Sequence, residues 1–151
     1  MAKAFSFSLE RVLDIRRHKE DQQAIILGKA KSALQNEQQK LSQLNDEKET
    51  MLNDSETTNT ENLDLNAIKI SGGYLQQLNQ NIGKQKNQIH LNNKKVSIER
   101  NKLNEVVKDK KIVEKLKEHK FEDHRLQVVK DEQRSDDEVA VRMVNHARQK
   151  R

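Results

Sequence analysis

The fold is decided by the stretch LQQLNQNIGKQKNQIHLNNKKVSIERNKL, residues 75–103. Apolar side chains recur in it every seven residues without a miss, at Leu75, Ile82, Ile89, Val96 and Leu103. A companion series, offset by three residues, is half polar and consists of Leu78, Gln85, Asn92, Glu99, Val106 and Val113. Two series with this offset form the a/d seam of a coiled coil. The stretch therefore predicts a long helix that packs along one seam.

A second seam lies upstream in LGKAKSALQNEQQKLSQLNDEKETM, residues 27–51. Six of its eight seam positions are apolar, and the eight are Leu27, Ala30, Leu34, Glu37, Leu41, Leu44, Lys48 and Met51. A less regular apolar face precedes it, formed by Phe5, Leu9, Leu13, Ile15, Ala24 and Ile26. This pattern predicts a first helix able to pair with the second.

The segment between the seams, NDSETTNTEN at residues 53–62, has no apolar side chain. Its Asn, Asp, Ser and Thr side chains compete for backbone hydrogen bonds and favour a turn. We expect helix one over about 8–52, a turn over about 53–65 and helix two over about 66–147. Since a short turn makes neighbouring helices antiparallel, the prediction is an all-α, elongated, two-helix antiparallel coiled-coil hairpin. It forms a single unit over 1–151, with the C-terminal helix longer.

Two irregularities are expected in the second helix. After Lys110 the apolar positions no longer fit one register, which predicts a stutter that locally changes the supercoil. The stretch DEQRSDDE, residues 131–138, interrupts the thinner pattern that follows.

The composition excludes most other classes of protein. Charged residues are 35% and the hydrophobic set only 32% of the chain, below the ~45–50% of globular domains. There is no Cys, so disulfides and thiolate zinc sites are excluded. No apolar run approaches the ~18 residues of a membrane span. The opening MAKAFSFSLE lacks the long apolar block of a signal peptide, so we expect a cytoplasmic location.

The net charge of +5 is concentrated in residues 71–120, which hold 12 basic and 5 acidic side chains. The stretch NKKVSIERNKLNEVVKDKK, residues 93–111, could bind nucleic acid. It lacks interleaved aromatic residues for base stacking, however, and acidic residues are mixed into it. A solvated face, or a surface facing an acidic protein, is the favoured interpretation, and no nucleic-acid partner is expected.

No combination of residues carries catalytic chemistry. His119, Asp123 and His124 could lie together on a helix, but an exposed helix supplies no supporting shell for a metal ion. There is no nucleophile with a base, no phosphate-binding loop and no pair of carboxylates in a cleft. We therefore predict a protein that is not an enzyme and has no metal or cofactor.

Three aromatic residues have two open interpretations each. Phe5 and Phe7 could staple the start of the first helix against the second, or could be exposed anchors for a partner. Tyr74, which follows Gly72 and Gly73, could be a packing residue near the turn or an exposed binding residue.

The order of several short motifs resembles the family of the flagellar export protein FliJ. The opening FSFSLERVLDIRRHKEDQQA is similar to the start of that family through Phe5, Phe7, Leu9, Val12, Leu13, Arg16, Glu20 and Ala24. Later matches are Tyr74, Leu78, Ile82 and Gln85; Glu114, Lys115, Leu116 and Glu118; and Asp137, Glu138 and Ala140. The similarity covers nearly the whole chain.

This resemblance implies a stalk-like coiled coil, similar to the central stalk of rotary ATPases. It implies insertion into the hexameric ring of the flagellar export ATPase and stimulation of that ATPase. It also implies contact with the cytoplasmic linker of the export gate membrane protein, escort of export chaperones, and a peripheral place at the membrane through these partners only.

The resemblance also implies which residues meet each partner. Those expected to meet the ATPase are Phe5, Phe7, Leu9, Arg11, Arg16, Arg17, Asp137 and Glu138. Those expected to meet the gate are Tyr74, Leu78 and Gln85. The alternatives are the equivalent stalk of a virulence type III secretion system, and a generic coiled-coil adaptor or holdase chaperone.

Overall fold

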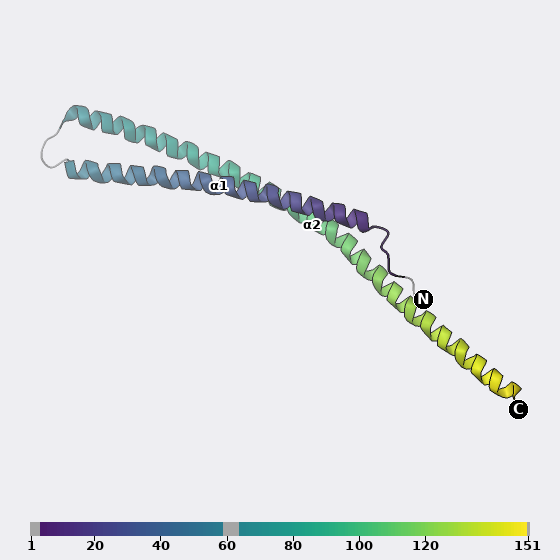
Figure 1. Cartoon of the computed structure of the whole chain (residues 1–151). Helices are drawn as coiled ribbons and strands as arrows, with labels where there is room; N and C mark the ends of the chain where they lie inside the picture. The colour runs from purple at the N-terminus through teal and green to yellow at the C-terminus, as the bar shows by residue number, and fades with distance from the viewer. Residues whose placement is uncertain (1–3, 59–63, 151) are drawn as a thin grey trace. The chain divides into compact units, whose positions relative to one another are not determined.

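A computed structural model of the chain describes residues 4–58 and 64–150. Its two helices are α1, Glu10–Thr58, and α2, Leu65–Gln149 (Figure 1). The two helices pack against each other as an antiparallel hairpin, because their contacts run in opposite directions along the chain. Glu10, Gln23 and Glu37 of α1 contact, in this order, Lys117, Glu99 and Gln85 of α2. The all-α hairpin with a longer second helix is therefore confirmed.

The C-terminal end of α1 continues through the segment NDSETT, which the sequence placed in the turn. The hydroxyl of Ser55 donates a hydrogen bond of 2.8 Å to the carbonyl of Met51, four residues back. The side chain therefore bonds to a carbonyl of its own helix and does not break the helix. The other residues of the predicted turn, 59–63, lie outside the described part.

The helix α2 begins at a cap that the sequence analysis missed. The Asp64 carboxylate accepts a hydrogen bond of 3.0 Å from the Asn66 backbone, and the Asp64 carbonyl accepts one of 3.0 Å from Ile68. A side-chain oxygen at this position satisfies a backbone N–H group that has no partner within the helix.

The stretch DEQRSDDE interrupts the apolar pattern but lies within the continuous helix α2, as the predicted range of helix two has it. Polar pairs within α2 lie at both ends of this stretch. Gln127 donates to Asp131 at 2.8 Å, and Arg142 lies 4.0 Å from Glu138. Pairs one turn apart stabilise exposed helices modestly.

The hairpin divides into two compact units, which we describe separately. The central unit is Asp21–Glu105, and the terminal unit is Met1–Glu20 with Val106–Arg151. In the central unit all of the predicted seam positions are buried or half-buried. The most buried apolar side chains are Leu27, Leu78, Ile82 and Val96. Both predicted seams are therefore confirmed there.

Two pairs of polar seam residues in the central unit are hydrogen-bonded between the helices. Gln85 donates to the carbonyl of Glu37 at 2.8 Å and to its carboxylate at 2.5 Å. Gln23 makes the same pair of bonds to Glu99, at 3.2 and 2.6 Å. The donor lies on α2 in one layer and on α1 in the other, so the two layers have the same kind of contact in opposite directions.

The seam also continues into the terminal unit, where polar residues occupy most of its positions. On α1 it passes through Leu13, Arg16 and Glu20. The predicted apolar face through Ile15, Ala24 and Ile26 was wrong, because all three side chains are exposed. The heptad register of Leu27 extends unbroken toward the N-terminus and leaves them outside the seam.

The sequence predicted that the register of α2 shifts directly after Lys110, and that prediction was wrong. Lys110, Val113 and Lys117 continue the same alternating spacing of three and four residues in the terminal unit. His124, which is half-buried, follows Lys117 by seven residues and keeps this spacing, whereas Phe121 is 49% exposed and contacts Phe5. The stutter predicted after Lys110 is therefore not seen in these residues.

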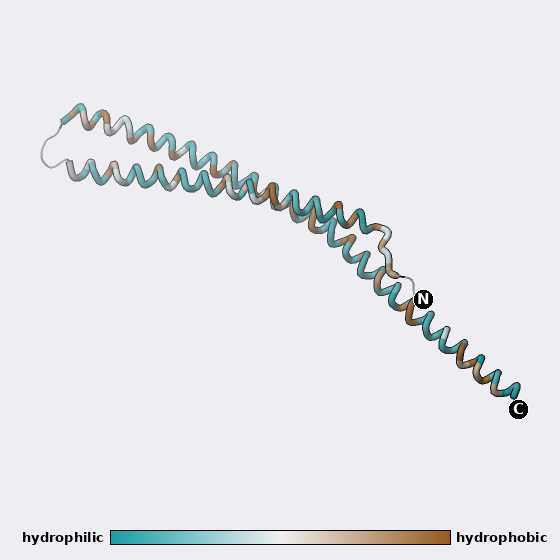
Figure 2. The backbone as a smooth tube through the Cα atoms, in the orientation of Figure 1, coloured by the Kyte–Doolittle hydropathy of each residue, from teal (hydrophilic) through white to brown (hydrophobic). Residues whose placement is uncertain are grey.

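Most positions along both helices are hydrophilic, with isolated apolar residues between them (Figure 2). In the described residues no helix is long and apolar enough to cross a membrane.

Candidate protein-interaction sites

The N-terminal residues of the terminal unit are attached to α2 through an aromatic contact. The ring of Phe5 meets that of Phe121 edge-on, with centroids 5.2 Å apart and planes at 82°. It also meets the ring of His124, at 5.6 Å and 63°. Edge-to-face geometry of this kind is favourable between aromatic rings. Phe5 therefore acts as the staple that the sequence left as one of two alternatives.

The helix α1 begins at Glu10, shortly after Phe5 and Phe7. The amide of Glu10 donates to the carbonyl of Phe7 at 3.2 Å, and the Phe7 side chain is half-buried. The Leu13 side chain, one turn further, is fully buried at 0% exposure.

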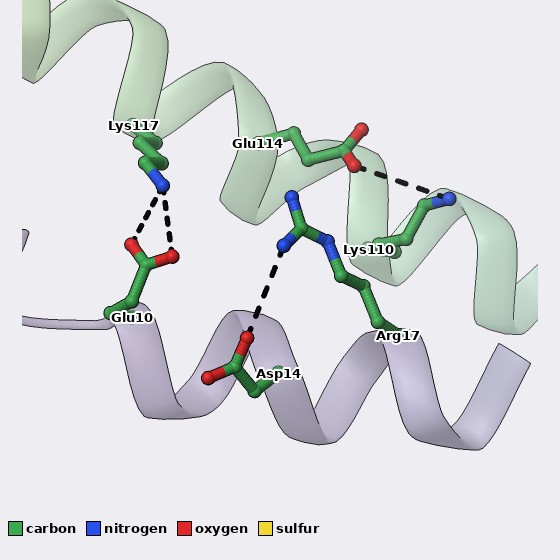
Figure 3. Close-up of polar contacts among 6 residues, drawn as sticks. All are labelled: Glu10, Asp14, Arg17, Lys110, Glu114 and Lys117. Atoms are coloured by element: carbon green, nitrogen blue, oxygen red, sulfur yellow. Dashed lines mark hydrogen bonds and ion pairs between the residues drawn. The ribbon is translucent and has the colours of Figure 1, made fainter.

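Ion pairs join the two helices on either side of Leu13 along α1. Lys117 lies 2.9 and 2.8 Å from the two carboxylate oxygens of Glu10, as the dashed lines in Figure 3 show. Arg16 lies 2.9 Å from Asp109, and Lys110 pairs with Glu20. These contacts join α1 and α2 within the terminal unit.

Carboxylates near Lys110, a seam residue, favour the charged form of its side chain. Its hydrogen bond to Glu20 raises its pKa above the ordinary value, and partial burial opposes that rise. The negative charges of Glu20 and Glu114 raise the pKa further. Lys110 is therefore charged at neutral pH. Lys110 and Lys117 were not predicted as seam residues, although the seven-residue spacing extended from Leu103 reaches both.

The other residues expected to meet the ATPase are open to solvent. Leu9, Arg11 and Arg17 are exposed, and Arg17 lies 3.9 Å from Asp14 on its own helix. Asp137 and Glu138 are also exposed. They follow His124, which contacts Phe5, by about 20 Å along α2 at 1.5 Å per residue. The structure therefore does not bring these acidic residues to Phe5.

The three residues expected to meet the gate lie in different surroundings in the central unit. Leu78 is buried at 3% exposure, and Gln85 is bound to Glu37 across the seam. Tyr74 is 44% exposed, and its hydroxyl donates to the Glu47 carboxylate. That hydrogen bond, followed by desolvation, raises the pKa of Tyr74. Of the three side chains, that of Tyr74 is the most exposed.

Tyr74 also lines an open pocket of about 520 Å³ between the helices of the central unit. The lining residues are Glu47, Thr50, Met51, Asp54, Ser55, Ser71 and Tyr74. They are carboxylates, hydroxyls, one thioether and one phenol. Among the described residues no group of three or more His, Asp and Glu is placed to hold a metal ion.

The fold defines an all-helical coiled-coil hairpin. A model of the family described as "Flagellar FliJ protein" matches residues 5–149, and the chain belongs to this family. Membership implies a structural component of the flagellar export apparatus, in a family that is generally not enzymatic. No curated protein and no solved structure matches the chain.

Proposed function

We propose that this protein is the stalk of the flagellar export ATPase. In this proposal it inserts into the hexameric ring, stimulates ATP hydrolysis, links the ring to the export gate and escorts export chaperones. It is cytoplasmic and reaches the membrane only through these partners. The observation that supports it, beside the family match, is the terminal unit, where the N-terminal residues and the C-terminal part of α2 share one packed structure.

The predicted ATPase contacts form three groups, which have different parts in this proposal. Phe7, Leu9, Arg11 and Arg17 present accessible side chains that can touch the ring. Phe5 and Arg16 hold the segment on α2 through Phe121 and Asp109. Asp137 and Glu138 make a second, separate contact further along α2.

The proposed gate contact is centred on Tyr74 in the central unit. A half-exposed tyrosine next to an open pocket is a favoured type of binding residue. Leu78 and Gln85 support this surface from the seam, where they hold α2 on α1.

The test is the ATP hydrolysis rate of the cognate export ATPase with and without this chain. The stalk proposal predicts stimulation together with ring assembly, and loss of both in a Phe5→Ala, Phe7→Ala variant. A matched control replaces two exposed apolar residues of the central unit, Ile25→Ala and Ile26→Ala, and should keep the stimulation. Absence of stimulation and of ring binding would refute the stalk.

The alternatives predict other results. A generic adaptor or holdase would keep its partner when either end of the chain is trimmed, because the seam alone would bind. A stalk of a virulence secretion system would stimulate that system's ATPase instead. The family match favours the flagellar system.

A further inference from the structure

The two units are closed by different kinds of polar contact. In the terminal unit the helices are joined by ion pairs, in which Lys117, Arg16 and Lys110 are the cations. In the central unit the donors between the helices are neutral and belong to Gln23, Gln85 and Tyr74. These are contacts of the described residues in each unit.

The seam also buries apolar side chains in both units. Those of the terminal unit are Leu13 and Val113, and those of the longer central unit are Leu27, Leu78, Ile82 and Val96. In the terminal unit the ion pairs between the helices therefore act beside a short apolar contact.

These charges are within reach of dissolved ions. The Glu10 and Lys117 side chains are 44% and 35% exposed, and Asp109 is 51% exposed. Partly exposed ion pairs are screened by salt, with a Debye length of about 10 Å at ~0.1 M and about 3 Å at ~1 M. Burial of apolar surface is not screened in this way.

We propose that residues 10–20 of α1 form an electrostatic latch. The latch holds the N-terminal end of α1 on α2 at low ionic strength and releases it at high ionic strength, while the central unit stays closed. Release uncovers the seam face of α2 at Lys110, Val113 and Lys117. The latch is inferred from the ion pairs and does not rest on the proposed function. Only its consequence for the ATPase, whose proposed contacts lie on the same segment, rests on the proposed function.

The test is amide hydrogen exchange of the isolated full chain, followed by mass spectrometry. Between about 0.05 M and about 1 M NaCl, exchange over residues 10–20 should accelerate about tenfold, as expected when three partly exposed ion pairs are screened. Residues 27–51 should change by less than about twofold under the same conditions. Equal acceleration in both segments, or no response over 10–20, would overturn the latch.

Two variants separate the latch from a general effect of salt. Glu20→Leu with Lys110→Leu replaces a seam ion pair by apolar contact, so it should slow exchange over residues 10–20 and weaken the salt response. The control, Lys115→Leu with Glu118→Leu, removes an ion pair of 2.9 Å that lies within α2 and should leave the response unchanged. An unchanged response in the first variant would also count against the latch. Since no ATPase is present, these results do not depend on the proposed function.

Discussion

The amide of Gln85 on α2 donates to both the backbone carbonyl and the carboxylate of Glu37 on α1, at 2.8 and 2.5 Å. Glu37 also accepts from Lys40, one turn further along its own helix, at 2.9 Å. A seam position that looks unfavourable for packing is thus fully hydrogen-bonded. Because Gln85 reaches one particular residue of α1, the contact also specifies the register of the two helices.

Replacing Gln85 tests this layer. Gln85→Ala removes the donor between the helices and leaves the Glu37 carbonyl and carboxylate without it. We expect the Tm of thermal unfolding to fall by a few degrees. Gln88→Ala changes an exposed residue on the same helix and should have little effect. Circular dichroism at 222 nm measures both, and equal effects would show that the layer adds no stability.

The terminal unit should be sensitive to its one fully buried side chain. Leu13→Ala removes apolar volume at 0% exposure, so we expect a loss of about 2–3 kcal/mol in the free energy of local opening. Ile15→Ala, at 56% exposure on the same turn, should change it by less than about 0.5 kcal/mol. Hydrogen exchange of residues 10–20 measures the difference. Similar values for the two variants would contradict the seam that we assign.

The glycine at position 83 weakens α2 without a packing reason. A Cβ built on Gly83 meets no atom within 4 Å, and the residue lies in regular helix. Gly83→Ala should therefore raise the free energy of unfolding by about 0.5–1 kcal/mol. Gly83→Val should raise it less, because a β-branched side chain loses rotamer freedom in a helix. Urea unfolding measures both variants, and a destabilised Ala variant would show that the site needs flexibility.

Acid should weaken the central unit through its two seam glutamates. Hydrogen bonds from Lys40 and then Gln85 lower the pKa of Glu37 below its usual 4.5, and those from Gln23 and then Lys102 lower the pKa of Glu99. A carboxyl group whose pKa is lower in the folded state stabilises the fold above its unfolded pKa. That stability is lost as the pH falls through the folded pKa.

We therefore expect the Tm to fall as the pH is lowered through and below 4.5. The double variant Glu37→Gln, Glu99→Gln should show a flatter acid limb. Glu49→Gln with Glu105→Gln, at two exposed positions, should keep the slope. The same acid limb in the first variant as in the parent chain would mean that other carboxyl groups cause it.

How far the sequence predicts this protein can be judged from particular residues. The series from Leu75 to Leu103 predicted α2, and the matching series from Leu27 to Met51 predicted α1. Both predictions were correct because the seven-residue spacing needs only local helix geometry. The helical state of Ser55 was not predicted, because a serine hydroxyl can bond to its own helix as well as break it.

The interaction sites were less accessible to sequence reasoning. Phe5 could be a staple or an anchor until Phe121 was seen beside its ring. The burial of Leu78 and the pairing of Gln85 were likewise not visible in the motifs that drew attention to them. Their part in binding a partner stays a prediction.

The sequence by itself determined that this protein is two amphipathic helices in an antiparallel hairpin, and its motifs pointed to the FliJ family. Only the tertiary structure decided which polar residues enter the seam. It placed Glu20 against Lys110 and left Ile15 in solvent. The physical reason is that each of these positions depends on a residue far away in the chain, on the opposite helix, while helix formation depends on neighbours within one turn.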